Sequence, residues 1–381
     1  MAINKPKNEE KQLGRKVLVG MSGGVDSSVA AALLLQQGYE VIGAFMKNWS
    51  DGGEDSECSW RSERRDAMRV AAQLGISLLT FDFEKEYREE VYEYMINEYK
   101  SGRTPNPDVL CNKYMKFGHL WREAEKLGCD FIATGHYARI ERDATLPLPE
   151  GELEVVEEKG QVHLFAGVDK NKDQSYFLCQ LSQEQLRHVL LPIGDITKPE
   201  VRKIARKLNL VVADKKDSQG ICFVGKVKMQ DFLKISIPEQ VGNIVTTSGE
   251  VIGQHKGHAY YTIGQRTGLG LGGGTPYFIV ERRPETNEII VAVGEDDPAL
   301  FSSKLQAVEL VETIPENLQR FVRKQIKARI RYRQPLQDCT ITAIEDSVAH
   351  VKFDEPQRAV APGQFIVWYD GEELIGSGII K

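Results

Sequence analysis

The sequence predicts an α/β N-terminal domain with a parallel sheet, followed by a small β-rich central domain and a C-terminal β-barrel. Short apolar runs that alternate with amphipathic helical repeats predict the sheet. After about Gly220 the helical periodicity fades and short β-branched runs replace it, which predicts the two later domains. The expected boundaries are a disordered arm over 1–15, then domains over 16–219, 220–296 and 297–381.

The predicted elements follow from these patterns in chain order. Buried strands are expected at Val17–Met21, Val41–Met46, Leu78–Phe83, Phe131–Thr134 and Leu210–Ala213. Helices are expected where apolar residues recur at i, i+3, i+4 and i+7, around 67–74, 117–124 and 201–208. Later strands are expected at Asn243–Thr247, Tyr277–Glu281, Ile289–Val293, Thr340–Ile344, His350–Phe353, Gln364–Tyr369 and Ile375–Ile380. Ligands of such a parallel sheet gather at the carboxyl ends of its strands.

Composition narrows the class of protein. Apolar residues make up 41% and charged residues 27%, which is normal for a soluble globular protein. No run approaches the roughly 20 apolar residues of a membrane span, and residues 1–15 lack the apolar core of a signal peptide. We therefore expect a cytoplasmic protein with no membrane partner. A net charge of −6 argues against a protein that coats nucleic acid with its whole surface.

The segment between the first strand and its helix carries a phosphate-binding pattern. Its residues are Gly20, Met21, Ser22, Gly23, Gly24, Val25, Asp26 and Ser27. The glycines let the backbone approach an anion, and the helix start offers unpaired N–H groups. The string is not a Walker A loop. It resembles the pyrophosphate loop (PP-loop) of the adenine nucleotide alpha hydrolase-like enzymes, which implies ATP. A carboxylate at Asp26 beside phosphates suggests that a divalent cation, Mg²⁺, neutralises both.

The cysteines offer a second kind of chemistry. They stand at positions 58, 111, 129, 179, 222 and 339, and no two form a C-x-x-C pair. Neither zinc nor an iron–sulfur cluster is therefore predicted. Asp108 lies three residues before Cys111, so the two share a face if the segment is helical. Cys222 lies in a glycine-containing loop. Each cysteine taken alone is more often a small buried hydrophobe than a catalyst.

Taken together, these segments resemble the bacterial tRNA-specific 2-thiouridylases, which place sulfur on the wobble uridine of tRNA. The resemblance runs from about Lys16 to Lys381. It rests on GMSGGVDSS, NPDVLCN, ATGHYAR, KDQSYFL, DSQGICF, YTIGQR, RYRQ and APGQ in that order. The arm at 1–15 and an acidic stretch at 141–160 depart from the family pattern, and neither touches a motif.

The resemblance implies a role for each matching residue. Cys222 would carry a persulfide, and Cys111 would resolve it through a transient Cys111–Cys222 disulfide. Asp108 would be the acid/base group, while Met46 and the Gly135 backbone would contact adenine. The implied tRNA contacts are Asn106, Pro107, Asp108, His136, Lys172, Asp173, Gln174, Arg331, Tyr332 and Gln364. The implied partners are tRNA at uridine 34 and a cysteine desulfurase or relay protein that delivers sulfur.

A basic segment independently favours nucleic acid. Residues 319–334 contain seven Lys or Arg and no acid, in an acidic protein. Lys327, Arg329, Arg331 and Arg333 alternate, so in a strand they would project from one face. This pattern predicts an RNA-binding face on the C-terminal barrel. The alternative is a solvated edge strand, since charges also guard edges.

The predicted function is ATP-dependent 2-thiolation of uridine 34, with two alternatives. Another PP-loop ligase or amidotransferase would need a glutaminase domain or partner and would give the paired thiols no role. A non-catalytic tRNA-binding sulfur carrier would bind without releasing AMP.

Overall fold

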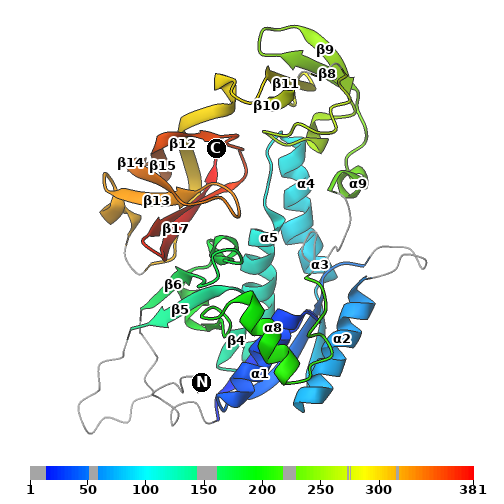
Figure 1. The fold of residues 1–381 in the computed structure, drawn as a ribbon, viewed down its shortest axis with the longest axis vertical. Coiled ribbons are helices and arrows are strands. Elements are labelled where there is room, and N and C mark those ends of the chain that lie inside the picture. Colours follow the sequence, from blue (N-terminus) through cyan, green and yellow to red (C-terminus); the bar gives the residue numbers. More distant parts are fainter. Residues whose placement is uncertain are drawn as a thin grey trace.

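The computed structural model describes residues 14–50, 59–143, 161–217, 229–272, 274, 276–314 and 317–381. An α/β domain lies at one end of the molecule, the barrel lies beside its middle, and a small β-rich domain lies at the other end (Figure 1). Cys58, Cys222, the arm at 1–13 and the acidic stretch at 144–160 lie outside the described residues.

The N-terminal domain is built on a five-stranded parallel sheet in the order β3-β2-β1-β4-β7. Its strands are β1 (Lys16–Gly20), β2 (Glu40–Lys47), β3 (Leu78–Asp82), β4 (Phe131–Ala133) and β7 (Val189–Leu190). The middle strand β1 is apolar on both faces, and Val17, Leu18 and Val19 are all fully buried. A strand of this composition needs helices on both sides of the sheet.

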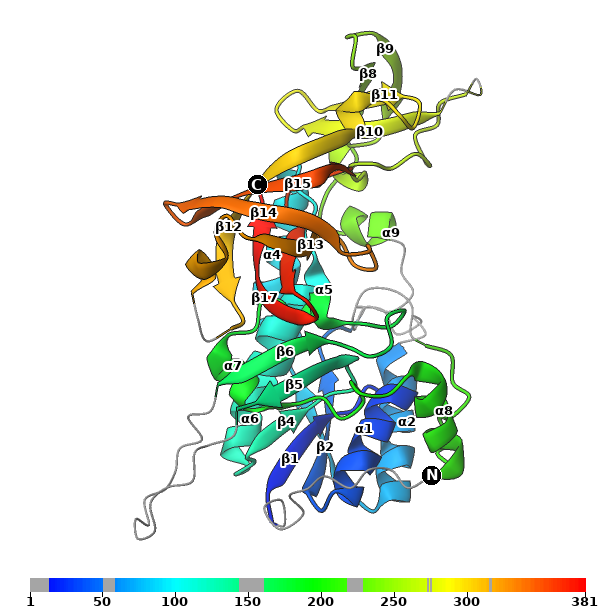
Figure 2. The ribbon, with the colours of Figure 1, turned by 60° about the vertical axis from the view of Figure 1, so that its left-hand side comes forward.

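Two layers of helices supply that cover. One face packs against α1 (Val25–Gln36), α2 (Ser59–Leu74) and α8 (Lys198–Lys207), which lie side by side in Figure 2. The opposite face carries η3 (Cys111–His119) and α6 (Leu120–Lys126). The segments before them are α3 (Glu84–Tyr87), η2 (Arg88–Tyr92), α4 (Glu93–Lys100) and α5 (Pro107–Leu110), and α4 reaches up to the central domain (Figure 1). Segments η2 and η3 are π-helical. The predicted doubly covered parallel sheet is confirmed.

One predicted strand is wrong. Leu210–Ala213 forms a turn, closed by a hydrogen bond from Ala213 N–H to the Leu210 carbonyl at 3.0 Å. Leu210, Val212 and Ala213 are buried in the same core as α8, so these three residues are apolar because they pack against helices, while Val211 is exposed. The fifth strand is instead the two-residue β7, which follows the short helix α7 (Gln183–Arg187).

A hairpin of the N-terminal domain extends the barrel sheet. Strands β5 (Ala138–Arg142) and β6 (Val162–Ala166) form the hairpin, and β6 pairs with β17. The eight-stranded sheet has the order β12-β15-β14-β13-β16-β17-β6-β5, and β12 also pairs with β17, which closes the barrel. The barrel strands are β12 (Phe301–Glu312), β13 (Gln325–Arg329), β14 (Gln337–Glu345), β15 (Val348–Arg358), β16 (Phe365–Asp370) and β17 (Glu373–Ile380).

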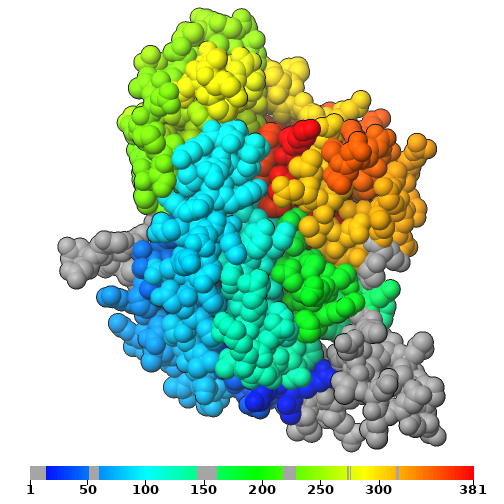
Figure 3. All heavy atoms as spheres, turned by 180° about the vertical axis from the view of Figure 1, so that it is seen from behind, coloured from blue at the N-terminus to red at the C-terminus, as the bar shows by residue number. Residues whose placement is uncertain are grey.

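The central domain is a four-stranded sheet in the order β10-β11-β8-β9. It comprises α9 (Met229–Lys234), β8 (Gly242–Thr246), β9 (Val251–His255), β10 (Tyr277–Arg283) and β11 (Glu288–Val293). Seen from behind, the cyan helical segment reaches from the N-terminal domain up to this domain, with the barrel beside it (Figure 3). Short 3₁₀ turns lie at Ser175–Leu178, His258–Tyr260, Pro298–Leu300 and Leu318–Phe321.

The basic segment does not form the continuous strand that its alternation predicted. Strand β13 ends at Arg329, and Arg331 to Arg333 lie in a turn in which Arg333 has a φ of 63°. Arg329 is buried and its guanidinium lies 3.1 Å from the Asp173 carboxylate. The four cations therefore do not share one exposed face, because the chain reverses direction after the second of them.

Candidate functional site

The loop after β1 is shaped by close backbone contacts. Gly23 has a φ of 71°, and a Cβ at this residue would lie 2.2 Å from the Glu63 carbonyl oxygen. Gly24 caps α1 and accepts a 2.7 Å hydrogen bond from the Ser28 hydroxyl. The Ser22 and Ser27 hydroxyls lie 3.4 Å apart, and the Ser27 hydroxyl also accepts a bond from Ser22 N–H. The helix start and its serines thus form one compact group of donors, suited to an anion.

The end of β4 presses against this loop. A Cβ at Gly135 would lie 2.5 Å from Ser27 N, so only glycine permits the approach. The next residue, His136, is buried, and its ring nitrogen lies 2.7 Å from the Thr134 hydroxyl. Burial, assisted by nearby Lys116, holds the pKa of His136 well below its usual value, so the imidazole is neutral. Met46 is buried at the carboxyl end of β2, the same edge of the sheet.

Asp26 is the charged residue of the loop, and it is already paired. Its Oδ1 atom accepts hydrogen bonds of 2.7 Å from both the Tyr137 hydroxyl and Lys198 Nζ. Its Oδ2 atom accepts a second bond from Lys198 at 2.8 Å. Lys198 thus supplies a counter-charge to Asp26, and the Mg²⁺ expected with ATP stays a prediction. Asp217 contacts the same ammonium at 2.8 Å.

The turn that precedes Asp108 and Cys111 is held by residues of the other two domains. Arg282 of the central domain donates a 2.6 Å bond to the Thr104 hydroxyl. Gln364 of the barrel donates to the carbonyls of Thr104 and Pro105 at 2.8 and 3.1 Å. Thr104 N–H donates to the Pro362 carbonyl at 2.7 Å. Three domains therefore meet at this one turn.

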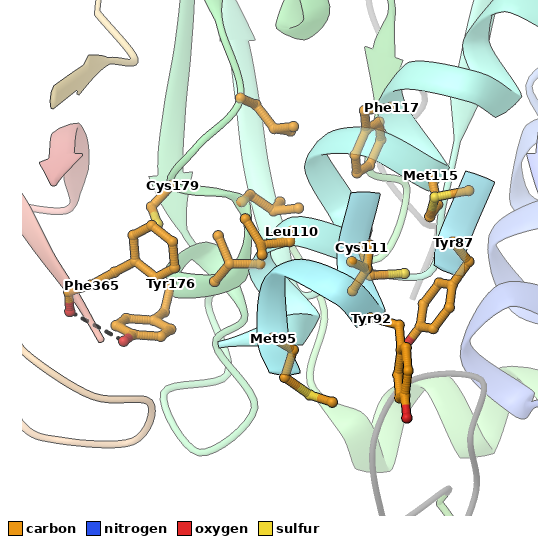
Figure 4. Packing of buried hydrophobic residues seen from close by; sticks show 14 of the residues in the cluster. Tyr87, Tyr92, Met95, Leu110, Cys111, Met115, Phe117, Tyr176, Cys179 and Phe365 are labelled. Atoms are coloured by element: carbon orange, nitrogen blue, oxygen red, sulfur yellow. Dashed lines mark hydrogen bonds between the residues drawn. The ribbon is translucent and has the colours of Figure 1, made fainter. Parts of the chain in front are cut away.

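Beyond the turn, the chain enters a helix, which is the condition under which Asp108 and Cys111 were expected to share a face. Asn106 caps α5 by accepting a bond from Val109 N–H, Pro107 is its first residue, and Asp108 is its second. Cys111 begins the π-helical segment, a geometry often found at functional sites. Its side chain is 0% exposed and lies among aromatic and aliphatic residues in Figure 4. Asp108 and Cys111 thus occupy one turn of helix, and Cys222 lies outside the described residues.

The other described cysteines fit a packing role. Cys129, Cys179 and Cys339 are buried. Burial raises the pKa of the Cys179 and Cys339 thiols to about 12 and also raises that of Cys129. Thiols with such pKa values are protonated at neutral pH and are poor nucleophiles.

Residues 172–174 connect the loop to the barrel. Lys172 pairs with Asp217 at 2.6 Å, and Gln174 accepts a bond from Tyr137 N–H. Asp173 is 4% exposed and contacts Arg329. In this conformation all three side chains bind protein groups, so their proposed contact with tRNA stays a prediction.

The predicted barrel contacts lie close to the turn. Gln364 touches it directly, as described above. Tyr332 packs on Phe177 with ring centroids 4.4 Å apart, and the exposed Arg331 donates to the Arg358 carbonyl at 3.2 Å. Because Phe177 also follows the 172–174 segment, the structure brings these two sets of predicted residues together.

Comparison with known proteins identifies the family. Residues 15–226 match a family model described as a tRNA methyl transferase HUP domain, residues 230–293 a PRC-barrel domain, and residues 306–380 an aminomethyltransferase beta-barrel domain. The chain is 49% identical over 366 residues to the tRNA-specific 2-thiouridylase MnmA of Lysinibacillus sphaericus, covering 96% of this chain and 94% of the relative. It is also 49% identical to tRNA-specific 2-thiouridylase MnmA 1 of Geobacillus kaustophilus, covering 96% and 95%.

The chain belongs to the tRNA-specific 2-thiouridylase family. The family models carry methyl-transfer descriptions, but the near-full-length relatives are named for thiolation, and identity of this extent decides the membership. Among solved structures, a U34-tRNA thiolase from Methanococcus maripaludis is similar at 17% identity and a TM-score of 0.30, covering 56% of this chain and 63% of that one. That likeness is too loose to support any statement about the site.

Sequence reasoning missed several residues of this 2-thiouridylase site. Tyr137, Lys198, Lys215 and Arg282 all hold site segments, yet none was singled out. Tyr137 lies inside the ATGHYAR motif, which was a usable signal. Lys198 bonds to Asp26 across 172 residues of sequence, and no local pattern reveals such a contact.

Two further findings concern this 2-thiouridylase chain. Among the described residues, no group of three His, Cys, Asp or Glu side chains is arranged to hold a metal ion. Within the same parts of the chain, no helix is long and apolar enough to cross a membrane.

Proposed function

We propose that this chain catalyses ATP-dependent 2-thiolation of the wobble uridine, position 34, of tRNA. The observation that supports this most strongly is identity of 49% to proteins named tRNA-specific 2-thiouridylases, across nearly the whole chain. The intact Ser22–Ser27 loop and the Asp108–Cys111 turn add the residue types that the reaction needs. We place the enzyme in the cytoplasm, with a cysteine desulfurase or relay protein as sulfur donor.

The first step activates an oxygen. The C2 oxygen of uracil is a poor leaving group, so it attacks the α-phosphate of ATP and pyrophosphate departs. The α1 N-terminus, Ser22 and Ser27 would hold the pyrophosphate, with Met46 and Gly135 beside the adenine. Mg²⁺ would enter with ATP, bound to its phosphates.

The second step delivers sulfur. The terminal sulfur of a Cys222 persulfide attacks C2, and AMP leaves with the former uracil oxygen. The transferred sulfur is then bonded to both C2 and Cys222 Sγ. The Cys111 thiolate attacks Cys222 Sγ, the bond between Cys222 Sγ and the transferred sulfur breaks, and a Cys111–Cys222 disulfide forms while the sulfur stays on the base. An external thiol reduces this disulfide. In the alternative order, Cys111 first releases hydrosulfide, which attacks C2, and the same disulfide results.

The surroundings of Cys111 suit this chemistry. Its side chain is fully buried, and an adenylated uridine needs protection from hydrolysis. Asp108 on the same turn would exchange a proton with the base, and Asn106 and Pro107 would shape its pocket. Reading uridine 34 requires the base to leave the anticodon stack, with contacts from Arg331, Tyr332, Gln364, His136 and residues 172–174.

The test is mass spectrometry of digested tRNA after incubation with ATP, Mg²⁺ and a persulfide donor. We expect 2-thiouridine at position 34 with the wild-type chain, and only background levels with Cys111→Ser or Cys222→Ser. Cys129→Ser is the matched control and should retain activity, because this buried cysteine lies between α6 and β4, outside the Asp108–Cys111 turn. Full-rate thiolation in both active-site variants would refute the sulfur mechanism. AMP release without thiolation would favour another ligase, and tRNA binding without AMP would favour a carrier.

A further inference from the structure

The Asp26 carboxylate has the contacts of a structural ion pair. Lys198 approaches both of its oxygens, at 2.7 and 2.8 Å, and the Tyr137 hydroxyl donates a third bond. The Lys198 side chain is 9% exposed. A buried ammonium of this kind needs carboxylate partners, because leaving it unpaired out of water is strongly destabilising. Displacing Lys198 from Asp26 would therefore be costly.

The same ammonium reaches a second carboxylate. Lys198 Nζ lies 2.8 Å from Asp217, which also pairs with Lys172 at 2.6 Å and Arg202 at 2.9 Å. Burial alone would raise the pKa of Asp217, but the bonds from Lys172 and Lys198 outweigh it and lower the pKa to about 2. Asp217 is thus ionised at any physiological pH. Lys198 forms a bridge between the loop helix and residue 217.

A second tether runs in parallel. Lys215 Nζ donates to the Gly23 carbonyl at 3.0 Å and to Asp66 at 2.7 Å. Gly23 is the loop residue with positive φ, so this bond fixes the most constrained peptide of the loop. Residues 215 and 217 are therefore both attached to the loop, one through its backbone and one through Asp26.

The arrangement also neutralises the negative charge of Asp26 beside the expected phosphate site. A carboxylate in the first turn of α1 would repel the phosphates that the loop is expected to hold. Lys198 cancels that charge without any metal ion. Lys172 and Arg202 supply two further cations around Asp217, so the cluster carries one cation more than it has carboxylates.

We propose that Asp26 and Lys198 form a lasting ion pair that positions the loop against residues 215–217, and that Asp26 is not a ligand of the Mg²⁺ accompanying ATP. The proposal rests on the proposed use of ATP by this loop. Lys198 is then a positioning residue, since it acts through Asp26 and Asp217.

A thermal double-mutant cycle with Asp26→Asn, Lys198→Met and the double variant tests the pair without any ligand. Asp26→Asn leaves the buried Lys198 with Asp217 as its carboxylate partner, and Lys198→Met leaves Asp26 with the Tyr137 hydroxyl, so each variant loses the shared ion pair and we expect each to lower Tm by about 5 °C. The double variant should lower Tm no further than Lys198→Met alone, because the two changes remove one shared interaction. Strictly additive losses would overturn the ion pair.

Binding of Mn²⁺, measured by electron paramagnetic resonance, tests whether Asp26 is a metal ligand. The samples contain saturating ATP and a tRNA transcript but no sulfur donor. We expect Asp26→Asn to leave the Mn²⁺ affinity within about 2-fold of wild type, while ATP binding weakens about 10-fold in both single variants. Mn²⁺ binding weakened more than 10-fold by Asp26→Asn, with Lys198→Met unaffected, would make Asp26 a metal ligand.

In the control pair, Arg206 lies on the same helix, α8, and Asp214 lies in the turn that follows it. Arg206 and Asp214 form an ion pair at 2.9 Å with side chains 62% and 78% exposed. Arg206→Met and Asp214→Asn should leave Tm, ATP and Mn²⁺ binding unchanged, because exposed pairs contribute little. None of these readouts requires thiolation. A chain that binds ATP but fails to thiolate tRNA would therefore refute the proposed function and leave this inference standing.

Discussion

The loop before α1 and the turn before α5 follow the same local plan but are held differently. In each, an Asp is the second residue of a helix, Asp26 in α1 and Asp108 in α5. The first loop is fixed by charged side chains of its own domain, Lys198 and Lys215. The second turn is fixed from the central domain and the barrel, mainly by bonds to backbone and hydroxyl groups.

This difference separates the two halves of the proposed reaction. The proposed ATP loop is held by side chains of one domain, so its geometry should depend little on how the domains assemble. The turn that leads to Cys111 exists only where three domains meet. Damage at the domain interface should therefore impair sulfur transfer while it spares ATP binding, and damage at the sheet edge should do the reverse.

The largest expected effect comes from Gly135→Ala, which changes the contact between Gly135 and the proposed ATP loop. The new Cβ would lie 2.5 Å from Ser27 N, so the loop must move by a large part of an ångström. A displacement of about 1 Å can cost about 100-fold in rate, and we expect that loss in AMP release. The tRNA affinity should persist. Gly272→Ala is the control, because no atom lies within 4 Å of its added Cβ. Wild-type AMP release in Gly135→Ala would show that this approach does not shape the site.

Gln364→Leu changes the turn that leads to Cys111, and its expected effect is smaller. It removes the two bonds to the Thr104 and Pro105 carbonyls. Loss of such bonds costs about 1.5 kcal/mol, so thiolation should fall about 10-fold while the ATP dissociation constant holds. Single-turnover thiolation and equilibrium dialysis measure the two quantities. Gln319→Leu, which loses one long bond on an exposed part of the barrel, is the control. Equal loss of ATP binding would contradict the separation.

The smallest effect is expected at Arg331, and its buried neighbour Arg329 provides the contrast. Arg331 is exposed, so Arg331→Gln should reduce the slope of log tRNA affinity against log salt by about one phosphate contact, with Tm unchanged. Arg329 is buried against Asp173, so Arg329→Gln should cost about 3 kcal/mol of stability and leave that slope unchanged. The reverse pattern would restore the single basic face that the sequence suggested.

Much of the fold could be predicted because it is encoded locally. The buried strand at Val17–Val19 and the helix after Gly24 are visible in runs of apolar residues and in glycine placement. The short β7 could not be found, because two residues carry no periodicity. Leu210–Ala213 misled because burial beneath a helix and burial in a sheet select the same apolar residues.

The site was predictable where a motif carries its own geometry. The three-residue spacing of Asp108 and Cys111 places both on one face of a helix, and the structure forms that helix. The partner of Asp26 was not predictable, since a carboxylate beside a phosphate loop suggests a cation and the sequence does not say which one. The alternation of Lys327 to Arg333 failed because a positive φ at Arg333 places it in a turn rather than a strand.

The hairpin that extends the barrel sheet has a consequence for synthesis on the ribosome. His163 on β6 contacts Glu373 on β17 across 210 residues of sequence. At about 5–20 residues per second, the edge of β6 waits about 10–40 s for its partner strand to be translated. During that time β6 is an open strand edge on a nascent chain, a template for wrong pairing. Arg139 and Glu141 on the adjacent strand place charge beside it. Chaperone dependence of this enzyme should therefore concentrate in the interval before β17 emerges.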